Sequence, residues 1–285
     1  MSDGLLDDVT GAHERLTEDE LGNLGVVLGA YRSFRGDRRK HLAYVSMPIT
    51  SGKRCYEVFS EHGVTSLEEL AAKCGKDAAY RLIIKPNIAE GIAFADRLGV
   101  ERSDLLFIAP SVFEAKRWRW SQDAYMSLWY RVLGELTGKH FLMDGWEYST
   151  GGVKEVMFTT FMQFTMLPFK SRAAMGEFDL KDFMTDLSPD QRLAEIEAMT
   201  KIRLHAADGS EIRVDQALAM IVKAIEDLKS RGLPYQDLVA PAMRMSTAPF
   251  LASVKYGRSR FPYDPNTPLY YDSDKRLKEI AWEKG

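Results

Sequence analysis

One short segment combines the residue types that nucleophilic chemistry and anion binding need: a hydroxyl, glycines and a carboxylate. It reads Ser149-Thr-Gly-Gly-Val-Lys-Glu155. The apolar run 141–143 precedes it, and the apolar segment 156–164 is long enough for a helix. A strand, a glycine-containing turn and a helix in this order bring polar groups to a ligand at the carboxyl ends of the strands in an open α/β sheet. The segment is therefore the first candidate for a functional site.

Three of its residues are the strongest candidates, Ser149, Gly151 and Glu155. Two of them also have an ordinary structural explanation. Ser149 has the type and position of a helix N-cap, and Glu155 could be a glutamate favoured near a helix N-terminus by the helix dipole. The segment alone leaves these explanations open.

Two further segments carry polar residues at places where a parallel sheet would deliver them. Tyr44-Val-Ser-Met-Pro-Ile-Thr-Ser-Gly52 ends an apolar strand in a glycine-containing turn. Gln122-Asp123 opens an amphipathic segment directly after a capping serine. By itself, Asp123 would be explained as a first-turn partner of the helix dipole.

Together the three segments resemble the nucleoside 2-deoxyribosyltransferase-like superfamily, and most of all its 2'-deoxynucleoside 5'-phosphate N-hydrolases and cytidine-monophosphate N-glycosidases. Tyr44, Ile49 and Gly52 follow the order of residues in that family's opening motif. Gln122-Asp123 is similar to its Gln-Asp helix motif, and Ser149–Glu155 is similar to its Ser-x-Gly-x-x-x-Glu signature. The three matches fall in the family's order between residues 44 and 155.

The resemblance implies cleavage of an N-glycosidic bond. This reaction passes through an oxocarbenium-like sugar, which a carboxylate near C1' can stabilise or trap covalently. Glu155 matches the family's nucleophile, and Asp123 matches its general acid, which protonates the departing base. Tyr44 matches a tyrosine near the sugar whose hydroxyl can orient the nucleophile.

The resemblance also implies a nucleoside 5'-monophosphate as the substrate. A serine stands at the position of Ser149 in the family's monophosphate branch, whereas the nucleoside branch has an aspartate there. An aspartate would repel a phosphate, but a hydroxyl beside glycine amides at a helix N-terminus attracts one. Gly151 and Gly152 leave room for the backbone to approach the ligand.

Three further residues are weaker candidates for substrate contacts. Lys53 and Arg54 could bind the phosphate or could be solvated loop charges, and the sequence favours neither. Trp146 could stack on the base, while Trp129 is expected in the core.

The chain also departs from the family pattern. Met47 stands where the family usually has glycine, and 155 − 123 = 32 residues separate the two carboxylates, more than the hydrolase branch leads us to expect. The basic and aromatic segment 116–120 has no family counterpart and suggests a surface lid or an interface, with single-stranded nucleic acid as a less favoured ligand. These departures, and a C-terminal segment without a counterpart, favour a modified nucleotide over a common one.

Apolar periodicity and capping signals predict the elements that would position these residues. Strands are expected at residues 41–47, 81–85, 104–109 and 141–143. Helices are expected at residues 18–35, 55–61, 66–75, 88–98 and 122–136, with Gly99 capping the fourth of them. This alternation predicts a Rossmann-like α/β fold, a parallel sheet covered by helices on both faces.

The C-terminal half has a different composition. A capping box at residues 188–191 predicts a helix, residues 202–214 a β-hairpin around Asp208-Gly209, and residues 214–231 an amphipathic helix. The last fifty residues lack periodicity and are expected to wrap over the first domain or a partner subunit. We therefore expect an N-terminal helical segment (1–40), a nucleotide N-glycosidase-like domain (41–168) and a mostly helical accessory region (169–285).

Composition narrows the functional classes. A formal net charge of −3 provides no overall positive electrostatic field that would attract nucleic acid. No apolar run approaches the roughly 20 residues that span a bilayer. The N-terminus lacks a signal-peptide pattern, and the 2 cysteines and 5 histidines lack metal-ligand spacing. We expect a cytoplasmic enzyme without metal or cofactor, and by resemblance a homodimer. The alternatives are a base-exchanging transferase, a nucleotide-binding module without turnover, and a nucleic-acid-associated protein.

Overall fold

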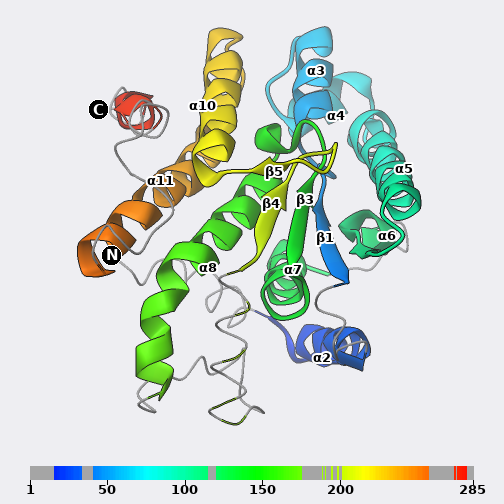
Figure 1. The fold of residues 1–285 in the computed structure, drawn as a ribbon. Helices are drawn as coiled ribbons and strands as arrows, with labels where there is room; N and C mark the ends of the chain where they lie inside the picture. The colour runs from blue at the N-terminus through cyan, green and yellow to red at the C-terminus, as the bar shows by residue number, and fades with distance from the viewer. Residues whose placement is uncertain are drawn as a thin grey trace.

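The computed structural model describes residues 16–33, 41–114, 120–174, 201–256 and 275–280, with residues 188, 190, 194, 198 and 273. Its centre is a five-stranded sheet in the order β2-β1-β3-β4-β5 (Figure 1). The strands are β1 (Leu42–Ser46), β2 (Leu106–Ile108), β3 (Lys139–Leu142), β4 (Arg203–His205) and β5 (Glu211–Ile212). The first four are parallel and β5 is antiparallel to β4. The prediction of an α/β fold is confirmed.

Helices cover both faces of this sheet (Figure 1). Ala43 and Val45 of β1 pack with Phe94 of α5 (Lys85–Glu101) on one face. Tyr44, which points the opposite way, belongs to the core with α7 (Gln122–Leu136) and α8 (Thr150–Ala174). Side chains of a strand alternate between its two faces, and both faces of β1 are covered. β1 is therefore buried along its whole length.

The strand order places a crevice between β1 and β3. The chain leaves β1 through α3 (Lys53–His62), α4 (Leu67–Cys74) and α5 to reach β2 on one side, and β3 lies on the other side. At such a switch point the connections after the two strands diverge, which opens a ligand crevice at their carboxyl ends. The connection after β3 is the segment that leads into α8.

Most predicted elements are present, and several of the predicted capping interactions are formed. Ser121 caps α7 by accepting a hydrogen bond from the Ala124 amide at 3.2 Å. Thr17 and Glu20 form a reciprocal capping box at the start of α2 (Glu18–Ser33). The predicted hairpin is β4–β5, and the predicted amphipathic helix is α10 (Val214–Ser230).

The strand predicted at residues 81–85 is wrong. Residues Tyr80–Ile84 form a π-helical turn that continues directly into α5. A short apolar run cannot be assigned to strand or helix by periodicity alone, and only Ile83 in this run is fully buried. Pro86 does not break the helix; it lies in the first turn of α5, directly after the π-helical turn. Gly99 is not the cap either, since α5 continues to Glu101.

The C-terminal residues are more regular than expected. Instead of an irregular wrapping segment, residues 236–256 form the long helix α11 (Gln236–Tyr256), which packs along α8. Residue 168 lies inside α8, and the chain after it supplies β4 and β5 of the sheet. The expected helix after residue 188 and the segment 116–119 lie largely outside the described residues, as do residues 257–272. Among the described residues, no helix is long and apolar enough to span a membrane.

Candidate active site

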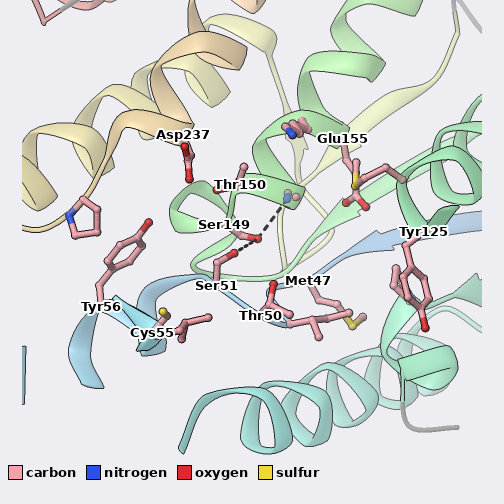
Figure 2. Close-up of a pocket in the computed structure, with 18 of the residues that line it drawn as sticks. Met47, Thr50, Ser51, Cys55, Tyr56, Tyr125, Ser149, Thr150, Glu155 and Asp237 are labelled. Atoms are coloured by element: carbon pink, nitrogen blue, oxygen red, sulfur yellow. Dashed lines mark hydrogen bonds between the residues drawn. The ribbon is translucent and has the colours of Figure 1, made fainter. Parts of the chain in front are cut away.

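A cavity of about 630 Å³ lies at the carboxyl ends of β1 and β3. Volumes of this size are typical of small-molecule sites. Its lining comes from the loops after both strands, from α3 and the start of α4, from the first turns of α8 and α11, and from one side of α7. Figure 2 shows an elongated arrangement, with Glu155 and Tyr125 towards one side, Ser51 and Ser149 in the middle, and Tyr56 and Asp237 towards the other side.

Glu155 is held at one side of this cavity by two hydroxyl donors from β1. The Tyr44 hydroxyl donates to Glu155 Oε1 at 2.5 Å. The Ser46 hydroxyl donates to the second carboxylate oxygen, Oε2. Tyr44 and Ser46 are two residues apart on one strand, so both face α8. The predicted contact between Tyr44 and Glu155 is therefore present in the structure.

The chain of polar contacts continues behind Ser46. His140 Nε2 lies 2.6 Å from the Ser46 hydroxyl oxygen, and His140 Nδ1 lies 2.9 Å from the Thr159 hydroxyl oxygen. Since Ser46 uses its single proton on Glu155, His140 donates from Nε2 to Ser46 and accepts at Nδ1 from Thr159. All of these side chains are buried. This chain of donors directs a proton towards the carboxylate of Glu155.

Burial controls the ionisation of this network. It raises the pKa of Glu155 to about 7, although the hydrogen bonds from Ser46 and Tyr44 act to lower it. Burial lowers the pKa of His140 to about 3, with a smaller contribution from His205. At neutral pH His140 is therefore an uncharged donor, and Glu155 changes between its acid and its carboxylate.

Ser149 caps α8 and also lines the cavity. Its hydroxyl oxygen accepts from the Gly152 amide at 3.4 Å and lies 3.2 Å from the Ser51 hydroxyl oxygen (Figure 2). A Cβ on Gly152 would lie 2.9 Å from the Trp146 carbonyl oxygen, so the close turn requires glycine there. Gly151 is less restricted, because a Cβ there would meet only Ser149 Oγ at 3.8 Å. The turn therefore presents hydroxyls and helix N-terminal amides to the cavity.

The loop after β1 is fixed by a residue that the sequence did not single out. Asn87 donates from its side-chain amide to the carbonyl oxygens of Ile49 and Ser51 at 3.0 and 3.1 Å. It comes from the first turn of α5, directly after the residues 81–85 where a strand was predicted. Gly52 closes the loop with φ 94°, and a Cβ there would collide with Pro48. This loop brings Ile49 into the cavity lining as predicted.

Other predicted substrate contacts lie elsewhere. Trp146 is 1% exposed and is not part of the cavity lining. Lys53 is exposed outside the lining, and Arg54 is paired with Glu90. Lys154, which the sequence did not single out, lines the cavity instead.

The α7 side of the cavity is aromatic. Tyr125 and Trp129 contribute to the lining, and the Trp129 ring lies 6.0 Å from the Tyr44 ring. Trp129 also belongs to the core, as predicted. Asp123 lies in the first turn of α7, but its side chain is outside the described part of the chain.

Met47 has a packing role that explains why methionine is accommodated. It is buried at the end of β1 and also reaches the cavity lining. On its other side it packs so closely on Gly91 of α5 that a Cβ there would collide with its sulfur. The bulk of Met47 is thus placed where α5 has no side chain.

Comparison of the chain with models of known protein families, with characterised proteins and with solved structures found no significant match.

Proposed function

We propose that this protein cleaves the N-glycosidic bond of a nucleoside 5'-phosphate, with Glu155 as the nucleophile. The observation that carries the proposal is the buried Glu155 carboxylate, which accepts hydrogen bonds from Tyr44 and Ser46 beside a cavity at the switch point of the sheet. A carboxylate held by two donors and open to a cavity suits attack on an electron-poor sugar carbon.

The proposed reaction has two steps. In the first, a Glu155 oxygen bonds to C1' as the bond from C1' to the base nitrogen breaks, and the base leaves with the electron pair. The resemblance assigns its protonation to Asp123, at the start of α7. In the second, water adds to C1', loses a proton and releases the carboxylate. A second base in place of water would give base exchange instead.

The network around Glu155 has a specific part in the first step. Only the ionised carboxylate is a nucleophile, and burial opposes ionisation. The donors Tyr44 and Ser46 oppose this effect and fix the orientation of the carboxylate. Neutral His140 keeps the proton of Ser46 directed at Glu155.

The turn before α8 is the proposed phosphate site. Ser149 and the amides of Gly151 and Gly152 lie at a helix N-terminus, where backbone N–H groups and the helix dipole favour an anion. Lys154 adds a positive charge to the lining. Six residues of helix rise by about 9 Å, so Glu155 and this turn are far enough apart to contact opposite ends of one sugar phosphate.

The assay that tests the proposal is release of free base from a panel of ribo- and deoxyribonucleoside 5'-monophosphates, including modified pyrimidines. We expect Glu155→Gln to reduce release by several orders of magnitude while the thermal transition stays cooperative. Glu57→Gln is the matched control, since Glu57 is exposed on α3 outside the cavity lining. Release that persists in Glu155→Gln would exclude the proposed nucleophile, and binding without release would favour a nucleotide-binding module.

The resemblance also supports a homodimer in the cytoplasm. Sedimentation equilibrium of the full chain tests the dimer, and a monomer at micromolar concentration would contradict it.

A further inference from the structure

The proposed anion site lies in the middle of the cavity rather than at its end. Figure 2 shows Ser51 and Ser149 between Glu155 on one side and Tyr56 and Asp237 on the other. All five of these residues belong to the lining of the same cavity. A ligand whose sugar contacts Glu155 and whose phosphate contacts Ser149 therefore leaves the far part of the cavity empty.

The far part is lined by groups that accept hydrogen bonds. Asp237 and Gln236 come from the first turn of α11, and Tyr56 comes from α3. Burial raises the pKa of Tyr56 to about 12, with smaller contributions from Cys55 and the Asp237 carboxylate, so the phenol stays protonated. A neutral phenol, an amide and a carboxylate together suit a ligand that carries hydroxyl groups.

The carboxylate also argues against a terminal phosphate. A phosphate monoester carries up to two negative charges at neutral pH, and one of its oxygens would face the side of the cavity that holds Asp237. A phosphate that bridges two groups keeps a single charge and continues into that side. Hydroxyl groups of that second group would then donate to the acceptors there, and no doubly charged terminal phosphate would face Asp237.

We propose that the preferred substrate carries a hydroxyl-bearing group on the far side of its 5'-phosphate, and that Asp237 and Tyr56 bind this group. The substrate class is then a nucleotide ester or anhydride, such as a nucleoside diphosphate sugar or a dinucleotide, rather than a free monophosphate. The inference rests on the proposed function for the placement of the sugar and the phosphate. It assigns a role to the start of α11, which the three sequence motifs do not reach.

The test compares matched pairs that differ only beyond the first phosphate: AMP with ADP-ribose, and UMP with UDP-glucose. Base release is measured as kcat/KM for wild type, Asp237→Asn and Tyr56→Phe. We expect wild type to favour the larger member of at least one pair by about tenfold or more, as expected for loss or gain of hydrogen bonds to a charged group. Asp237→Asn should remove most of this preference, because it lowers kcat/KM for the larger member of the pair more than for the monophosphate.

Asp96→Asn is the control, because Asp96 is exposed on α5 outside the cavity lining. Equal or better turnover of the monophosphates, unchanged by Asp237→Asn, would overturn the inference and leave the proposed function intact. If no nucleotide releases base, the proposed function fails. The inference is then decided by calorimetric binding of AMP and ADP-ribose to wild type and to Asp237→Asn: tighter ADP-ribose binding that depends on Asp237 supports it, and equal binding overturns it.

Discussion

The Tyr44 hydroxyl lies 2.5 Å from Glu155 Oε1 although the two residues are 111 positions apart in the chain. The parallel pairing of β1 with β3 explains this proximity. β3 leads through a short turn into α8, which packs over the face of β1 that carries Tyr44 and Ser46. The contact makes the ionisation of Glu155 depend on residues of the first strand.

Tyr44→Phe should raise the pH at which Glu155 becomes active. The phenol donates to the carboxylate and so favours its charged form. A hydrogen bond to a charged group is commonly worth about 1.5–3 kcal/mol, so the acidic limb of the kcat/KM profile should move up by about one to two pH units. A rate loss that is the same at every pH would show that Tyr44 does not act on the ionisation of Glu155.

Two adjacent threonines of α8 allow a matched test of the network. Thr159 donates to His140 Nδ1, whereas Thr160 donates only to the carbonyl oxygen of Val156 among the contacts described. In Thr159→Val, His140 is no longer held as the donor to Ser46, so the pH midpoint of activity should rise. Thr160→Val should lower the melting temperature by a similar amount and leave the midpoint unchanged. Equal midpoints in both variants would remove His140 from the mechanism.

Glu155→Gln should change the pH dependence of stability in a defined direction. The pKa of Glu155 is about 7 in the folded protein, against 4.5 for the ordinary side chain. The folded state therefore holds the proton more tightly, and this contribution to stability is fully present below pH 4.5 and is lost as pH rises through 7. Its size is roughly 3 kcal/mol. Melting temperatures should thus favour the variant increasingly between pH 5 and pH 8; a constant difference would contradict the raised pKa.

Gly152→Ala and Gly151→Ala should have different effects although the residues are adjacent. A Cβ on Gly152 would lie 2.9 Å from the Trp146 carbonyl oxygen, whereas one on Gly151 has ordinary contact distances. We expect Gly152→Ala to lower the melting temperature by several degrees and Gly151→Ala to leave it within about a degree or raise it, as alanine does in helices. Thermal denaturation by circular dichroism measures both, and equal losses would argue against a close turn at Gly152.

The sequence predicted the secondary elements well where capping residues or strict periodicity marked them. Ser121 at the start of α7 and Asp208-Gly209 in the β4–β5 hairpin are examples. It failed at residues 81–85, because a short apolar run satisfies both a buried strand and one face of a helix. It also failed at α11, where packing on α8 stabilises a helix whose own periodicity is weak.

Only part of the site was predictable from the sequence, because some of its residues come together only through the packing of separate elements. Tyr44, Ser149 and Glu155 stand in recognisable motifs, but Ser46, His140 and Thr159 come from three separate elements and are ordinary residues in each. Their role depends on strand register and on the rotation of α8, which the sequence does not display. Alternation along β1 could have indicated Ser46, since it shares a face with Tyr44.

Mass spectrometry tests most directly whether Glu155 forms a covalent bond to the sugar. A substrate analogue with fluorine at C2' slows the second step by destabilising the oxocarbenium-like transition state, so the glycosyl-enzyme should accumulate. We predict a mass increase equal to the sugar phosphate, located by peptide mapping on Glu155 and absent in Glu155→Gln. Base release from wild type without any adduct on Glu155, or an adduct on another residue, would contradict the account.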